Sequence, residues 1–251
     1  MKDKSGETRP LALVTATRKE MQAVLGHRVQ GLSLGGNRPQ QIKWGSKLLL
    51  LVITGIGPVN AALSMGRLLG AGLDLAGVLN LGIAGSFQAQ RFPLGAVVGV
   101  ETEIWPEFGL YTEQGLDPQG LGLGQGRIQK KVVWDRLSLH PKGAARSMGL
   151  KLDPKWPTVT SISVAGVSGT PERADELHSR TQAEVENMEG FALAWVSVLH
   201  GFPFLQIRSI SNRVGSRSPE EWDMDLAFSS LRQAAKQLLG PNKDPLPGEG
   251  Q

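Results

Sequence analysis

Two short stretches in the second half of the chain place polar residues beside apolar segments. In VENMEGFALAW, residues 185–195, Glu186 and Glu189 flank an amide and a methionine just before an apolar helix. In FPFLQIRSISNRVG, residues 202–215, an apolar strand ends on arginine, serine and Asn212. A carboxylate accepts two donors at once, whereas an asparagine amide offers two N–H donors. The two stretches therefore supply both acceptors and donors for a polar ligand.

Short apolar strands alternate with amphipathic helices along the chain, and these elements must position the polar residues. We expect strands at residues 11–15, 47–57, 77–85, 95–100, 158–166 and 204–211. We expect helices at residues 18–25, 58–69 and 170–180, after residue 189, and from a cap at Ser218 and Pro219 to about residue 239. Such alternation argues for a largely parallel sheet covered by helices on both faces.

The predicted strands end in polar or glycine-rich turns, at residues 15–17, 55–57, 82–85 and 211–212. Because ligands of such sheets bind beyond the carboxyl ends of the strands, we expect these turns to converge on one crevice. Residues 112–127 are too rich in glycine to pack, and we expect a surface insertion or mobile flap there.

The length of 251 residues fits a single α/β domain, residues 1–251, with a core at about 11–239 and polar tails at both ends. No apolar run approaches the roughly 20 residues of a membrane helix, so we expect no membrane association. The first ten residues lack the apolar centre of a signal peptide, and the chain has no cysteine. Both features favour a cytoplasmic protein.

Metal ions and nucleic acids are not expected as partners. Thiolate ligands are absent, and the four histidines (residues 27, 140, 178 and 200) show no metal-ligand spacing. The 27 basic and 23 acidic residues give a net charge of +4, but the basic residues are scattered and form no stripe with aromatic residues. The net positive charge is instead expected to attract an anionic small molecule mildly.

Several motifs that would indicate other chemistry fail on their spacing. GIGPVN has Asn60 where a dinucleotide fingerprint needs its third glycine, and neither GxxxxGK[ST] nor GxSxG occurs. GLGLGQG follows no strand and opens no helix. The GIG sequence at 55–57 has two open interpretations, a tight strand-to-helix turn or backbone N–H groups that face a ligand.

Four stretches together resemble the purine nucleoside phosphorylase/nucleosidase family. They are LVTATRKEM, TGIGPVNAA, NLGIAGSF, and ENMEG followed by IRSISN, and the resemblance runs from about residue 11 to 239. It implies a three-layer α/β sandwich with a mixed, largely parallel central sheet, no metal, no cofactor, and a homo-oligomer, often a dimer. Within the family, ENMEG, LGIAGSF and the final asparagine of RSISN are most similar to members that cleave futalosine, which implies hydrolysis of the N-glycosidic bond between hypoxanthine and a modified ribose.

The resemblance also implies roles for individual side chains. Glu20 corresponds to the carboxylate that orients the attacking water, and as a general base it must lie within hydrogen-bond reach of that water. Glu189 corresponds to the acceptor of the ribose hydroxyls, which stabilises cationic character on the sugar. Met188 is expected to pack beneath the ribose, whereas Glu186 and Asn187 are expected to reach either the purine edge or a neighbouring backbone.

Asn212 differs from the residue that adenine-releasing relatives carry at this position, and this difference decides the expected substrate. Adenine-releasing relatives carry an aspartate here, which can accept from a 6-amino group, whereas the asparagine N–H donors suit a 6-oxopurine. Ile83 replaces a small polar residue of those relatives and makes this wall apolar, while Ala84 and Gly85 leave room for a close backbone approach. Arg208 is expected to brace the strand end by pairing with a carboxylate of ENMEG.

Three alternatives stay open at this point. A methylthioadenosine/S-adenosylhomocysteine nucleosidase has the same fold but requires adenine, which Asn212 disfavours. A purine nucleoside phosphorylase would use phosphate in place of water, and Glu20 would repel phosphate. A non-catalytic purine-binding module is disfavoured by the presence of both Glu20 and Glu189.

Overall fold

The computed structural model describes residues 8–26 and 39–241 of the chain. Most of the two predicted polar tails, and His27, lie outside the described residues. Within them, no helix combines the length and the apolar character needed to cross a membrane.

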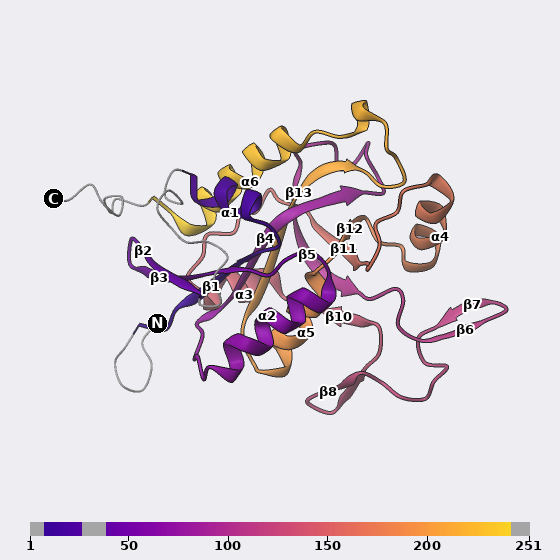
Figure 1. Ribbon diagram of the computed structural model, residues 1–251, viewed down its shortest axis with the longest axis horizontal. Helices are drawn as coiled ribbons and strands as arrows, with labels where there is room; N and C mark the ends of the chain where they lie inside the picture. The colour runs from indigo at the N-terminus through magenta and orange to yellow at the C-terminus, as the bar shows by residue number, and fades with distance from the viewer. Residues whose placement is uncertain (1–7, 27–38, 242–251) are drawn as a thin grey trace.

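A mixed sheet, nine-stranded within the described residues, forms the centre of the molecule (Figure 1). Its strands are β1 (Leu11–Thr15), β2 (Gln40–Trp44), β3 (Lys47–Ile53), β4 (Gly77–Ser86), β5 (Val97–Ile104), β10 (Arg136–Ser138), β11 (Thr158–Ser163), β12 (Val185–Asn187) and β13 (Phe204–Arg213). They follow the order β10-β5-β11-β12-β4-β1-β3-β2, and β13 pairs with both β4 and β5. The pairs of β1 with β3 and β4, and of β13 with β4, are parallel, so the carboxyl ends of these strands lie at one edge.

Helices cover both faces of this sheet. They are α1 (Arg18–Leu25), α2 (Pro58–Gly70), α3 (Pro141–Ser147), α4 (Pro171–Thr181), α5 (Gly190–Leu199) and α6 (Met224–Leu239). In Figure 1, α1 and α6 lie above the sheet and α2 and α5 below it. The predicted three-layer α/β sandwich is confirmed.

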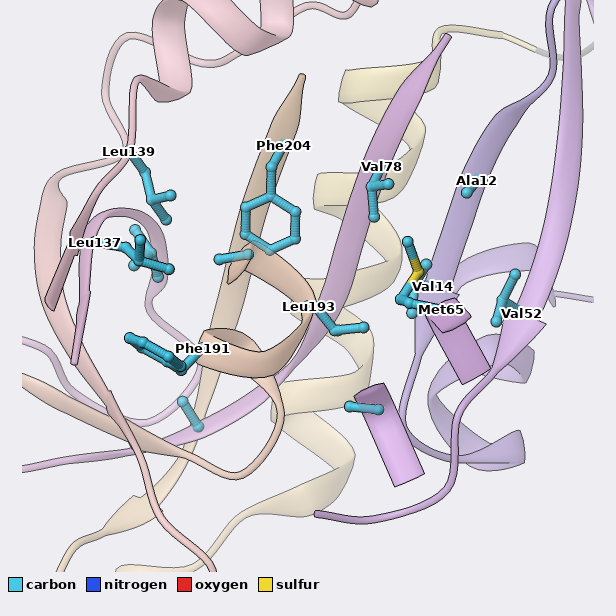
Figure 2. Close-up of a cluster of buried hydrophobic side chains, with 14 of the residues drawn as sticks. Ala12, Val14, Val52, Met65, Val78, Leu137, Leu139, Phe191, Leu193 and Phe204 are labelled. Atoms are coloured by element: carbon cyan, nitrogen blue, oxygen red, sulfur yellow. The ribbon is translucent and has the colours of Figure 1, made fainter. Parts of the chain in front are cut away.

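Alternation of side chains along the buried strands builds one core on each side of the sheet. On β1, Leu11 and Leu13 pack with residues of α1 and α6, whereas Ala12 and Val14 pack with residues of α2 and α5. Figure 2 shows part of the second core, where Phe191 and Leu193 of α5 face the sheet. The apolar strand residues of this second core therefore pack against α2 and α5.

Several elements of the fold were not predicted, among them β2, α3, β10 and β12. β10 and β12 have three residues each, which is too short to show a periodicity. The glycine-rich segment 112–127 contains β7 (Gly115–Asp117) and joins β6 (Leu110–Thr112) to β8 (Gly126–Ile128), which pairs with β9 (Lys131–Val133). These hairpins are largely exposed at the lower right of Figure 1.

The last helix also begins later than the predicted cap. Ser218 makes no capping hydrogen bond, and Pro219 opens only a short 3-10 turn, Pro219–Glu221. Asp223 caps α6 instead, and its side chain accepts a hydrogen bond from the N–H of Leu226 at 2.8 Å. The extended residue between turn and helix, Trp222, forms an isolated antiparallel bridge with Asn212.

Candidate functional site

The carboxyl ends of β1, β4 and β13 bring the predicted site residues to one edge of the sheet. Glu20 follows β1, Ile83 lies near the end of β4, and Asn212 lies near the end of β13. Glu189 reaches the same edge from the start of α5. These four residues from separate parts of the sequence therefore lie at the same edge of the sheet.

Glu20 is a buried carboxylate in the first turn of α1, with only 5% of its surface exposed. It completes a capping box, since its Oε2 accepts from the N–H and the hydroxyl of Thr17, both at 2.8 Å. Its Oε1 accepts from the N–H of Ile83 at 3.2 Å. Local helix capping and the neighbouring strand thus fix both oxygens of this side chain.

Glu189 is a second buried carboxylate, at the N-cap position of α5. Its Oε1 accepts from the backbone N–H of Gly57 at 2.9 Å, so this N–H group of the GIG turn is bonded to a side chain of the protein. Burial raises the pKa of Glu189, the charge of Arg208 and the Gly57 N–H lower it, and the charge of Glu20 raises it further. The two carboxylates are therefore close enough to influence each other.

Arg208 lies directly beneath these carboxylates and is only 2% exposed. Its charge acts on Glu189, but its hydrogen bonds go to amide oxygens, from Nη1 to Asn80 and from Nη2 to Asn187, each at 3.4 Å. A Cβ added at Gly82 would overlap Nη1 of Arg208 and lie 2.9 Å from Oε1 of Glu20. A side chain at position 82 would therefore displace the end of the Arg208 or Glu20 side chain.

Asn187 points into the protein rather than toward the crevice. Its Oδ1 accepts from the N–H groups of Glu189 and Gly190 at 2.9 and 2.6 Å, and its Nδ2 donates to Oε1 of Glu103 at 2.9 Å. The buried amide therefore anchors the start of α5. The neighbouring Met188 is partly buried against the small core under α4.

Glu186 is bound to the loop that follows β11. Its two oxygens accept from the N–H and the hydroxyl of Ser168, at 2.9 and 2.6 Å. Burial raises the pKa of Glu186, while these two hydrogen bonds lower it. The hydrogen bonds of Glu186 thus go to Ser168, and the expected pairing of Arg208 with ENMEG is seen only as the charge interaction with Glu189.

Asn212 lies across the strand ladder from Gly85, at a register shift in β13. Its Oδ1 accepts from the hydroxyl of Ser211 at 2.8 Å, and its Nδ2 donates to the carbonyl of Arg213 at 3.1 Å. Because a carbonyl can only accept, the amide orientation is defined, and one N–H of Nδ2 is left for a ligand. A Cβ at Gly85 would lie 2.9 Å from this nitrogen, so the glycine keeps its surroundings open.

Two further predicted residues, Ile83 and Ala84, precede Gly85 on β4. Ile83 is half-buried on β4, and Ala84 is buried. Trp222 lies beside the strand end through its bridge to Asn212, and its indole N–H donates to the carbonyl of Ser216 at 2.9 Å.

Sequence analysis missed a buried polar cluster beneath the site, centred on Glu103. This carboxylate of β5 also accepts from the hydroxyl of Ser163 at 2.7 Å and from Nε2 of Gln206 at 2.8 Å. In the sequence it appears in GVETEI beside Glu101, which is exposed. The strand pattern alone does not distinguish the buried glutamate from the exposed one.

The chain is similar to known proteins over most of its length. Residues 10–240 match the model of the Phosphorylase superfamily. A futalosine hydrolase of Thermus thermophilus is 34% identical over 192 residues, covering 74% of this chain and 79% of the relative. One of Streptomyces coelicolor is 32% identical over 196 residues, covering 75% and 77%. A solved futalosine hydrolase mutant of Helicobacter pylori matches the fold with a TM-score of 0.67, at 20% identity and 91% and 96% coverage.

Replacing Glu189 by glutamine should change the pH dependence of the free energy of unfolding. The raised pKa means that the folded protein holds this proton to a higher pH than the unfolded chain, so folded-state stability falls as the pH rises through the raised value. Glu189→Gln does not titrate, so its stability relative to the wild type should increase with pH and the difference should shrink below about pH 4. Urea unfolding at pH values below and above about 4 measures the difference in free energy of unfolding between variant and wild type. Glu101→Gln, at an exposed residue, is the control. A difference independent of pH would contradict the burial argument.

Proposed function

Because the chain belongs to the phosphorylase superfamily, we propose that it hydrolyses the N-glycosidic bond of futalosine, releasing hypoxanthine and dehypoxanthine futalosine. The names of the curated relatives support this substrate, and a place in the alternative menaquinone pathway is part of the proposal. The observation that carries the proposal is the placement of two buried carboxylates, Glu20 and Glu189, at the edge where Asn212 ends β13.

In the proposed reaction, Glu20 accepts a proton from water as the water oxygen attacks the anomeric carbon of the ribose. The electron pair of the broken C–N bond leaves with the purine, which takes up a proton from solvent to become hypoxanthine, and Glu20 returns its proton to solvent. The sugar passes through an oxocarbenium-like state. Thr17 and Ile83 hold the Glu20 carboxylate from two sides, which fixes the direction in which it can accept the proton.

Glu189 is proposed to accept hydrogen bonds from the ribose hydroxyls and to stabilise the positive charge that develops on the sugar. Gly57 donates to its Oε1 and the backbone of Met188 also hydrogen-bonds this carboxylate, which has about four acceptor positions and so keeps some for hydroxyl groups. A carboxylate held in a buried site stabilises a developing cation more strongly than one in water. Met188 is proposed to pack against the ribose.

The base is proposed to lie between Asn212 and Glu186. Both residues pair with Gly85 in the sheet, and residues directly opposite each other point to the same face. The remaining N–H of Asn212 suits the 6-oxo group of hypoxanthine, and the Glu186 carboxylate can accept from the ring N–H next to that group. Ile83 and Ala84 would supply an apolar contact. Asn187, whose amide is engaged inside the protein, would act only by holding α5 in place.

Cytoplasmic location and a homo-oligomeric state are part of the proposal. The absence of cysteine supports the first. For the second, Ile56, Val59 and Leu63 form a stripe at and beside the start of α2, with 57%, 78% and 51% of their surfaces exposed. An uncharged stripe can pack on its own copy across a two-fold axis, and it adjoins Gly57 of the crevice.

Wild-type protein should release hypoxanthine from futalosine without phosphate, and Glu20→Gln should lose most of this activity. General-base catalysis contributes about 100- to 10,000-fold, and glutamine keeps the shape but removes the base. Chromatography of the released base, with inosine and methylthioadenosine as further substrates, separates the hydrolase from a phosphorylase and from an adenine-specific nucleosidase. Glu172→Gln, in the exposed first turn of α4, is the matched control. Near-wild-type turnover of Glu20→Gln would remove Glu20 from the mechanism.

Asn212→Asp should shift preference from 6-oxopurine to 6-aminopurine nucleosides. The carboxylate oxygens of an ionised aspartate and the 6-oxo group of the purine are both hydrogen-bond acceptors, so they cannot pair. A 6-amino group, in contrast, can donate to the carboxylate. One mispaired buried contact of about 1–3 kcal/mol corresponds to roughly 5- to 150-fold in relative kcat/KM. The measurement is kcat/KM for futalosine and its aminated counterpart with both proteins. A ratio unchanged within about twofold would show that Asn212 does not read the base.

Val59→Asp should dissociate the proposed oligomer, because a carboxylate would have to be buried without a partner. Sedimentation velocity or light scattering measures the mass of the wild type and the variant. The control is Leu199→Asp, which adds the same charge at an exposed residue, the last one of α5. A monomeric wild type, or an oligomer unaffected by Val59→Asp, would refute this interface.

A further inference from the structure

A directed hydrogen-bond network connects Arg208 to Glu103 beneath the crevice. On the first path, Nη1 of Arg208 donates to Asn80, Nδ2 of Asn80 donates to Oε1 of Gln206 at 3.2 Å, and Nε2 of Gln206 donates to Glu103 at 2.8 Å. On the second path, Nη2 of Arg208 donates to Oδ1 of Asn187, whose Nδ2 donates to Glu103 at 2.9 Å. Both paths run from the same donor to the same acceptor.

The two ends of this network favour one orientation of each amide between them, and the carbonyl of Ile162, which accepts from Nδ2 of Asn187 at 3.1 Å, supports the same orientation of Asn187. A guanidinium has only donors, and an ionised carboxylate has only acceptors. Each intervening amide must therefore turn its oxygen toward Arg208 and its nitrogen toward Glu103. The hydroxyl of Ser163 donates to Glu103 as well, so all three side chains that contact this carboxylate are donors.

The network lies against the start of α5, where Glu189 is located. Asn187 accepts from the N–H groups of both Glu189 and Gly190, and a Cβ at Gly190 would lie within 2.7 Å of Gln206 and Glu103. The orientation of the Asn187 amide thus fixes the first residues of the helix. Reversing that amide would set Nδ2 against two backbone N–H groups.

We propose that Glu103 is a positioning residue for the reaction: by accepting from both amide paths, it holds Asn187 and Arg208 in the arrangement that places Glu189. The catalytic part of this inference rests on the proposed function. Glu103 is fully buried, and among the described residues its hydrogen-bond partners are the side chains of Ser163, Asn187 and Gln206.

Glutamine at position 103 cannot satisfy this network in any orientation. If its oxygen faces Asn187, its nitrogen faces the nitrogen of Gln206. Turning Gln206 moves the donor–donor contact to Asn80, and turning Asn80 moves it to Arg208, which cannot accept. Exchanging the two residues, as Glu103→Gln with Gln206→Glu, removes the conflict. The new glutamine then accepts from Asn187 and donates to the new carboxylate, which also accepts from Asn80.

Glu103→Gln should lower kcat for futalosine by about 10- to 100-fold, as expected for a misplaced catalytic group, with KM within about threefold. Hydrogen exchange of the peptide spanning residues 187–191 should become faster, because the donor–donor conflict displaces side chains that pack against Gly190 and contact Asn187, whose Oδ1 accepts from the N–H groups of Glu189 and Gly190. The exchanged double variant should recover both properties, and Glu101→Gln on the exposed side of β5 should change neither.

The two readouts separate this inference from the proposed function. If the wild type does not release hypoxanthine from futalosine, the proposed function fails, while hydrogen exchange still decides whether Glu103 holds the start of α5. A folded Glu103→Gln with kcat within about twofold of the wild type, or with unchanged exchange at 187–191, overturns the proposal. Should the single variant fail to fold, a double variant that is unfolded or equally inactive overturns it.

Discussion

The burial of one guanidinium, that of Arg208, is the constraint on which the crevice depends. An unpaired charge inside a protein is strongly destabilising, so the surrounding residues must supply opposite charge and hydrogen-bond acceptors. Glu103 and Glu189 provide the charge from two sides, and the amides of Asn80 and Asn187 provide the acceptors. Burial raises the pKa of Glu103, and the hydroxyl of Ser163, the amide of Asn187 and the charge of Arg208 oppose that rise.

This arrangement requires residues that are distant in the sequence to meet in the sheet. β4 lies between β12 and β13 at the crevice edge, so that Gly85 separates the residues proposed to contact the base. Three steps earlier on β4, Gly82 leaves space for Arg208 and Glu20. The small residues of NLGIAGSF therefore define the shape of the crevice, while the flanking elements supply its polar groups.

The sequence predicts the parts of this structure that depend on local pattern. Apolar runs such as LALVT and the helix signals around Pro58 and Pro171 correspond to β1, α2 and α4. The inward direction of Asn187 and the burial of Glu103 were not predictable, because both depend on strand pairs that join distant segments. The cap of α6 was misplaced for another reason. Ser218 and Asp223 both carry capping side chains, and the bridge of Trp222 to Asn212 leaves only Asp223 at the helix start.

The hydrogen bond from Gly57 to Glu189 has a consequence for the conformational entropy of binding. A free glutamate side chain loses rotamer freedom of up to about 2 kcal/mol when a ligand immobilises it. In this protein the GIG turn and the charge of Arg208 restrict that side chain before any ligand enters. A sugar that meets Glu189 therefore encounters an acceptor already ordered, and more of the contact energy appears as affinity or as catalysis.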